Sequence, residues 1–133
     1  MLNCGLYIVT LRNEEPISVN RGDHRIEHRC IRVTRVHCKF GKARDFAVRE
    51  RNYVKVFERK NLVFTPLFGL VDIGWAEGVV LRQLRPWRVR GPSGRRNEWL
   101  EGIEPCEVER IALAALVENG IEFEHLGSVS PHS

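Results

Sequence analysis

Arginine is the residue type in this sequence with the clearest chemical meaning. Of the 21 Lys and Arg residues, 17 are arginine. The planar guanidinium holds two phosphate oxygens at once, which favours arginine wherever a polyanion is bound. Residues 1–96 carry 20 Lys and Arg against 9 Asp and Glu, whereas residues 97–133 carry one against eight. This distribution favours a nucleic-acid partner. The alternative is an ordinary solvated basic surface.

Residues 85–96 concentrate this charge. The segment RPWRVRGPSGRR holds five arginines, two prolines and two glycines but no acidic residue, so we expect a loop. Like charges crowded in a loop repel one another, and a phosphate backbone offsets that repulsion. We predict DNA contacts in this loop and at basic positions near the second predicted strand, namely Arg35, His37, Lys42, Arg85, Arg88, Arg90, Arg95 and Arg96.

Hydrophobic patterns predict the elements that position these side chains. Residues 5–11 are short, β-branched and aromatic, which indicates a strand, and residues 33–41 alternate between apolar and basic. The two segments are expected to pair as an antiparallel hairpin across a long loop at 12–32. Asp45 is a suitable N-cap for a helix that continues to about Glu58.

The rest of the chain completes a ββαβαα order. Residues 61–73 predict a third strand, residues 74–84 a second helix, and residues 105–119 a third helix that starts at Pro105. We therefore expect a small three-stranded antiparallel sheet flanked by helices, of the α+β class. The core would span residues 1–104, and a C-terminal helix with a short tail, residues 105–133, would pack on the same domain.

Length and cysteine usage narrow the class of protein. A chain of 133 residues fits one domain, and no apolar run approaches the roughly 20 residues of a membrane span. The four cysteines are scattered without a CxxC pair, and no secretory signal is visible, so we expect reduced thiols and a cytoplasmic protein. A zinc-stabilised DNA-binding protein is the alternative, with candidate ligands His24, His28, Cys30, His37 and Cys38.

Two segments of the sequence together resemble the GIY-YIG nuclease superfamily. The first predicted strand opens with Gly5-Leu6-Tyr7, and the second ends in Lys39-Phe40-Gly41 and continues as KARDFAVR to Arg49. The order, and the spacing of eight residues from Gly41 to Arg49, match the motifs of that family. The later segment NEWL at residues 97–100 is similar to one found in its small phage and bacterial-type branch. The resemblance covers roughly residues 5–100.

This resemblance implies a DNA endonuclease that hydrolyses phosphodiester bonds with one divalent ion, Mg²⁺ or Mn²⁺. Tyr7 would be the general base and Lys39 would stabilise its phenolate, while Arg49 would hold a phosphate oxygen. Tyr53, one helical turn after Arg49, would bond the phosphate or the water. Glu77 on the second predicted helix would bind the metal, with Glu98 as the fallback. One carboxylate suits Mg²⁺, which keeps most of its waters.

Two positions differ from the family pattern. Lys39 stands where the family's second tyrosine is usual, and Tyr53 stands where a histidine is often found. These differences leave an alternative open: a GIY-YIG-like module that binds nucleic acid without cutting it. A homodimer or a partner subunit is compatible with either activity, and the acidic helix at 105–119 is a candidate surface for it.

Overall fold

The sheet of this protein is built around β1 (Gly5–Leu11), whose side chains are buried on both faces. In the computed structural model, which describes residues 2–21, 30–91 and 96–129, β1 lies between β4 (His37–Ala43) and β5 (Leu62–Gly69). All three strands are antiparallel to their neighbours. Apolar residues at nearly every position of β1 explain its central place, because both faces of a central strand are covered.

The prediction of a three-stranded sheet is wrong. In the described residues the main sheet has six strands in the order β6-β7-β4-β1-β5-β8, and β2 (Ile17–Ser18) and β3 (Arg32–Val33) form a second sheet of two strands. The added strands are β6 (Arg88–Arg90), β7 (Arg96–Glu101) and β8 (Glu124–His125). The fold is α+β, with helices on both faces of this antiparallel sheet.

The segment predicted as an arginine-rich loop accounts for most of this difference. Residues 85–87 form a short 3₁₀ turn, and β6 then pairs with β7, which in turn pairs with the edge of β4. The prolines and glycines of residues 85–96 are typical of a loop, and β6 and β7 have more polar than apolar residues, so the sequence did not predict strands there. The edge of β4 offers unpaired backbone groups, so pairing there does not require an apolar alternation.

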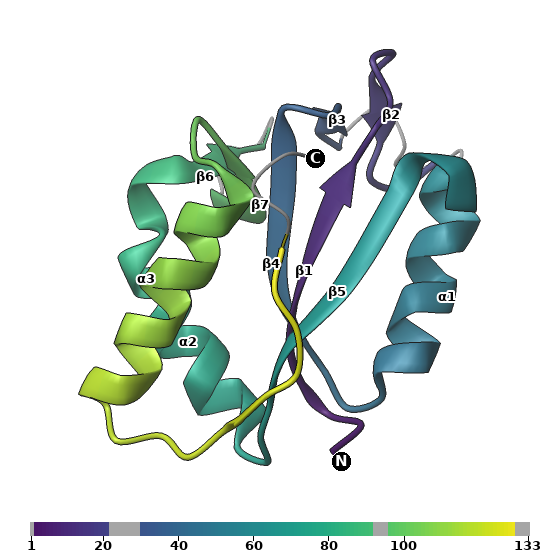
Figure 1. Ribbon diagram of the computed structural model, residues 1–133. Coiled ribbons are helices and arrows are strands. Elements are labelled where there is room, and N and C mark those ends of the chain that lie inside the picture. The colour runs from purple at the N-terminus through teal and green to yellow at the C-terminus, as the bar shows by residue number, and fades with distance from the viewer. Residues whose placement is uncertain (1, 22–29, 92–95, 130–133) are drawn as a thin grey trace.

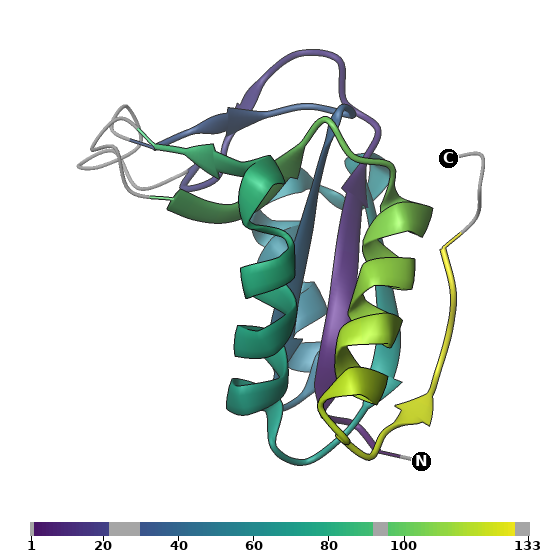
Figure 2. The same cartoon turned by 90° about the vertical axis from the view of Figure 1, so that its left-hand side faces the viewer.

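The helices cover the two faces of the sheet unequally. Figure 1 shows α1 (Phe46–Phe57) on one face, and α2 (Ile73–Gln83) and α3 (Pro105–Glu118) on the other. Figure 2, from the side of the paired helices, shows α2 and α3 in front of the strands. Two hydrophobic clusters result: one under α1 that includes Tyr7 and Phe57, and one under α2 and α3 that includes Phe40 and Leu116.

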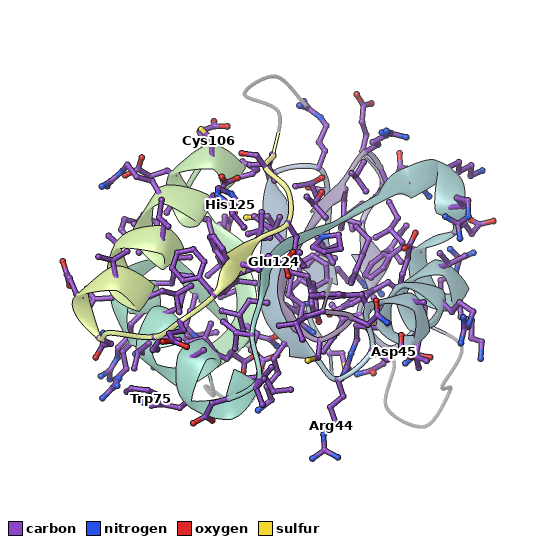
Figure 3. The ribbon with its side chains drawn as sticks, turned by 60° about the horizontal axis from the view of Figure 1, so that its bottom comes forward. Arg44, Asp45, Trp75, Cys106, Glu124 and His125 are labelled. Carbon is purple, nitrogen blue, oxygen red and sulfur yellow. The ribbon has the colours of Figure 1, made fainter. Side chains whose placement is uncertain are left out.

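Local signals set the start and end of the helices. The Asp45 carboxylate accepts hydrogen bonds from the backbone N–H groups of Ala47 and Val48, at 2.9 and 3.3 Å, which caps α1 as the sequence predicts. Figure 3 shows Asp45 at this end of α1, with Arg44 pointing away from the protein. Pro105 is the first residue of α3. None of the described helices is long and apolar enough to cross a membrane.

Candidate active site

The phenol ring of Tyr7 is held between β4 and α1. Tyr7 lies opposite Gly41 in the register of β1 and β4, and its hydroxyl shares a 2.5 Å hydrogen bond with the hydroxyl of Tyr53 on α1. The ring stacks on Phe64 with centroids 4.7 Å apart. A Cβ on Gly41 would stand 2.5 Å from the Tyr7 hydroxyl oxygen, so only glycine leaves room for the ring here. The two motif segments are therefore in direct contact.

Glycine is required at position 5 for a different steric reason. Its φ of +152° and the approach of its backbone to the Phe68 carbonyl oxygen on β5 exclude a side chain. Gly5 therefore allows β1 to pair closely with β5 at the start of the strand, two residues before Tyr7.

Lys39 projects from β4 on the same face as Tyr7, because it lies opposite Val9, two residues along β1. Its ammonium group is 3.6 Å from a carboxylate oxygen of Glu98 on β7 and 5.1 Å from the ring centroid of Tyr53. Burial lowers the pKa of Lys39, and the charge of Glu98 opposes this effect. Lys39 is thus a partly buried ammonium held between a carboxylate and an aromatic face.

Glu77 reaches the same region from α2. Its side chain is only 10% exposed, and one carboxylate oxygen lies 3.4 Å from the ammonium group of Lys42 on β4. Burial raises the pKa of Glu77, and the negative charge of Glu98 raises it further. The charges of Lys42 and Lys39 lower it. Glu77 therefore lies close enough to both Glu98 and Lys39 for their charges to act on it.

The free part of the edge of β4 allows groups from opposite faces of the sheet to meet. In the described residues β7 pairs with β4 only from His37 to Lys39, while β4 continues to Ala43. Side chains can approach one another around this unpaired edge. Lys39, from the α1 face, and Glu77, from α2 on the other face, are in this way brought into one charged cluster.

Arg49 is the exposed member of the cluster. It lies on α1 one turn before Tyr53, and its charge lowers the pKa of both tyrosines and of Lys39. Burial is the larger effect on Tyr7 and raises its pKa to about 12. The pKa of Tyr53 is also raised, first by burial and then by Tyr7. We define the reactive cluster by these mutual effects; its members are Tyr7, Lys39, Arg49, Tyr53, Glu77 and Glu98.

The role expected for Lys39, to stabilise a phenolate on Tyr7, stays a prediction. The positive charge of Arg49 lowers the pKa of Tyr7, while Lys39 contacts Glu98 and the ring of Tyr53. Arg49 is therefore a second cation that can act on Tyr7, and Lys39 also neutralises a carboxylate of the cluster.

Glu77 and Glu98 are the carboxylates available to a metal ion. Each is paired with a lysine, and each raises the pKa of Tyr7. Two carboxylates in one cluster fit Mg²⁺, which uses one or two of them and keeps several waters. No group of three His, Cys, Asp or Glu side chains gathers as a ligand set within the described ranges.

The zinc alternative gains no support from the residues that the structure describes. His37 and Cys38 are consecutive in β4, so their side chains lie on opposite faces, and Cys38 is in the core. His24 and His28 lie outside the described residues.

Two hollows adjoin the cluster. A pocket of about 430 Å³ is lined by Val19, Asn20, Lys39, Arg49, Asn52, Tyr53, Val56, Phe57, Asn97 and Trp99. A second hollow, of about 280 Å³, is lined by Lys42, Arg44, Asp45, Val48, Arg49, Asn52 and Ile73. Arg49 and Asn52 line both, so they form a ridge between the two. We call the first the amide pocket and the second the basic hollow.

The basic residues predicted to contact DNA occupy different environments. Arg35, Arg85 and Arg90 are exposed, and Arg35 lies 3.9 Å from Glu14. His37 is the first residue of β4. Its side chain is only 11% exposed, and its Nδ1 accepts a hydrogen bond from the Thr34 backbone N–H, which joins it to the turn before the strand.

Arg88 is the first residue of β6, and Arg96 is the first residue of β7. The Arg88 side chain donates to the carbonyl oxygen of Asn97, which ties β6 to β7. Arg95 lies outside the described residues, as does the side chain of Arg96.

Sequence reasoning missed two amides of this region, Asn52 and Asn97. Both line the amide pocket. Asn52 follows Arg49 by three residues and therefore shares its helix face, which was the available signal. Asn97 begins the NEWL segment but was not singled out as a site residue, because its place in the pocket depends on β7, which was not predicted as a strand.

Comparison of the chain with protein-family models, with curated proteins and with solved structures gave no match.

Proposed function

We propose that this protein is a divalent-metal-dependent DNA endonuclease that hydrolyses phosphodiester bonds and acts in the cytoplasm. The observation that supports this most is that the charges of Arg49 and Glu77 both act on the pKa of Tyr7, although the three residues lie on three separate elements. The GIY-YIG-like motif order led us to expect these three residue types together. A phenol can act as the base, a guanidinium can hold the phosphate and a carboxylate can bind a metal ion, which are functions that this reaction uses.

Arg49 is the residue that binds the scissile phosphate. It is exposed on the ridge between the two hollows, where a DNA strand can reach it without displacing the core. A guanidinium on a non-bridging oxygen stabilises the negative charge that develops during hydrolysis. Lys42 and Arg44, in the adjacent basic hollow, bind neighbouring phosphates.

The tyrosine pair supplies the general base. Tyr53 lines the amide pocket and Tyr7 lies behind it, joined by the 2.5 Å hydrogen bond. Because burial raises the pKa of Tyr7, the resting pair is neutral, and one phenol must first release its proton to solvent. The positive charge of Arg49 stabilises the phenolate left behind, which then takes the proton of the attacking water and returns to the neutral phenol.

Glu77 would hold the divalent ion, with Glu98 as the second carboxylate. A divalent ion supplies Lewis-acid stabilisation of the phosphate and lowers the pKa of nearby groups. Glu77 is buried and repelled by Glu98, so the protein favours a cation beside it. Without a metal, Lys42 pairs with Glu77 and Lys39 pairs with Glu98, so the two lysines neutralise the carboxylates.

The test is cleavage of supercoiled plasmid DNA with Mg²⁺ or Mn²⁺. We expect nicked or linear products, and Arg49→Ala should reduce the rate by about 100-fold or more. Arg51→Ala is the matched control, since Arg51 is also exposed on α1 but does not line either hollow. Glu77→Gln should abolish cleavage with little change in side-chain volume. Full activity of both Arg49→Ala and Glu77→Gln would overturn the proposal.

A module that binds nucleic acid without cutting it is the second candidate. It is favoured by the two ion pairs, Lys39–Glu98 and Lys42–Glu77, which neutralise the carboxylates without a metal. The same assay separates the candidates, because such a module retards DNA on a gel but leaves the plasmid supercoiled at every metal concentration.

A further inference from the structure

The amide pocket has a composition that differs from the rest of the basic surface. Three of its lining residues are asparagines and five are apolar or aromatic, while its two cations, Lys39 and Arg49, belong to the reactive cluster. The basic hollow has Lys42, Arg44 and Arg49 but one asparagine. The two hollows therefore suit different chemical groups on either side of Arg49.

We propose that the amide pocket is a nucleobase subsite, which takes one base of the substrate strand, turned out of the stack, next to the phosphate held by Arg49. This inference rests on the proposed function, because it names the part of the substrate that the same site holds. The basic hollow then follows the phosphates on the other side.

The size and walls of the pocket fit this group. A volume of about 430 Å³ lies in the range of about 300–1,000 Å³ typical of sites for small organic ligands. Val56, Phe57 and Trp99 provide apolar walls, and Trp99 is 2% exposed, so the wall behind the ligand is rigid. Enzymes that hold an extruded base combine such walls with hydrogen bonds to the edge of the base.

The asparagines supply the hydrogen bonds. A side-chain amide has both donors and an acceptor, and therefore matches the mixed edge of a nucleobase better than a phosphate, which only accepts. The Asn97 oxygen already accepts from the Glu98 backbone at 3.0 Å, which fixes the orientation of that amide. Asn52 is exposed on the ridge and makes no side-chain hydrogen bond to another described residue.

The neighbouring positions agree with a single nucleotide. Arg49 and Asn52 line both hollows, so a phosphate on Arg49 places the attached nucleoside at the mouth of the amide pocket. Tyr53 lies at the same mouth, with its hydroxyl bonded to Tyr7. The base would thus fix the position of the phosphate relative to the tyrosine pair.

The experiment is a titration of the ¹⁵N-labelled protein with 2′-deoxynucleoside 5′-monophosphates without metal, followed by NMR. The comparison ligands are 2-deoxyribose 5-phosphate and inorganic phosphate, which lack a base. We expect the mononucleotides to shift the side-chain signals of Asn52, Asn97 and Trp99 and to bind at least tenfold more tightly than the ligands without a base. Equal affinities, or no shifts with any mononucleotide at about 10 mM, would overturn the inference.

Two variants complete the test. Val56→Trp fills the pocket and should abolish the base-dependent shifts, whereas Val117→Trp, on the exposed surface of α3 and away from both hollows, should leave them unchanged. Asn52→Ala removes one amide from an exposed position and should weaken base-dependent binding at least threefold while the fold is kept. Unchanged binding by both Val56→Trp and Asn52→Ala would also refute the inference.

Failure of this inference and failure of the nuclease proposal are distinguishable. Nucleotide binding is measured without metal and without cleavage, so it stands if plasmid DNA is never cut. Plasmid cleavage without base-dependent binding would remove the subsite alone.

Discussion

Gly41 lies against the ring of Tyr7 so closely that a Cβ there would stand 2.5 Å from the phenol oxygen and 2.7 Å from Cζ. Tyr7 cannot simply move aside. It is 1% exposed, stacked on Phe64 and bonded to Tyr53. The glycine that ends the Lys39-Phe40-Gly41 segment is therefore required by the tyrosine of the other segment.

The first prediction follows from this contact. Gly41→Ala should destabilise the protein by about 1–3 kcal/mol, because overpacking a full site displaces its neighbours. The substitution should also weaken cleavage, because a displaced Tyr7 ring would distort its hydrogen bond with Tyr53. Gly78→Ala is the control: Gly78 lies within α2 with nothing within 4 Å of the added Cβ, and the change should stabilise by about 0.4–1 kcal/mol. Urea unfolding measures both, and equal effects would contradict the argument.

The second prediction concerns the ionisation of the tyrosines. The chain has only two, Tyr7 and Tyr53, and burial raises the pKa of both, that of Tyr7 to about 12 from an ordinary value of 10.0. The near-ultraviolet absorbance of tyrosinate should therefore stay low at pH 10 in the folded protein. In urea, half of the change should occur near pH 10. A folded-state transition near pH 10 would show that the phenols are accessible to water.

The raised pKa of Tyr7 also predicts how the free energy of unfolding changes with pH. The folded state keeps the proton on Tyr7 above the pH at which the unfolded chain loses it. The contribution of Tyr7 to the free energy of unfolding is therefore complete below pH 10. It is lost as the pH rises from 10.0 to about 12, by up to about 3 kcal/mol. In Tyr7→Phe this part of the alkaline loss should disappear, which urea unfolding at a series of pH values would reveal.

The third prediction uses the cysteines. Cys38 is 2% exposed, and burial raises the pKa of its thiol to about 12, whereas Cys106 is exposed at the start of α3. Since the thiolate is the reactive form, iodoacetamide should modify Cys106 first and Cys38 only after unfolding. Peptide mapping by mass spectrometry measures the rates. The Cys106→Ser variant should lose the fast reaction, and comparable rates for the two thiols would place Cys38 outside the core.

The local elements of this fold were predictable where a strong pattern agreed with the final packing. The strand at residues 5–11 has the bounds that its β-branched and aromatic composition indicates, and the helix capped by Asp45 starts where capping indicates. The second strand was predicted to start four residues too early, because Arg32 and Val33 also look like a strand and in fact pair with β2. The third predicted strand extended past Gly69 because the apolar residues continue into the turn before α2.

The size of the sheet could not be predicted in this way. β6 and β7 owe their structure to the edge of β4, which is a long-range pairing that local composition does not report. β8 has two exposed residues, Glu124 and His125, paired with Phe68 and Gly69 of β5. Only the finished sheet explains why these residues are extended.

The sequence named candidate residues of the site but not their electrostatic arrangement. The catalytic roles of Tyr7, Arg49 and Glu77 stay predictions, and the structure adds that the charges of Arg49 and Glu77 act on the pKa of Tyr7. The spacing could not show that Lys39 pairs with Glu98, since Glu98 depends on β7. It also could not show that Lys42, expected only to contact DNA, pairs with Glu77.

That last pair carries the fourth prediction. Burial and Glu98 raise the pKa of Glu77, and Lys42 lowers it, so Lys42→Gln should raise it further. If ionised Glu77 is required for cleavage, activity is lost as the pH falls through its pKa, and the acid limb of the pH–rate profile should move to higher pH in the variant. Lys55→Gln, at the end of α1 and away from both hollows, is the control and should leave the limb in place. An acid limb at the same pH in wild type and Lys42→Gln would mean that a group other than Glu77 governs it.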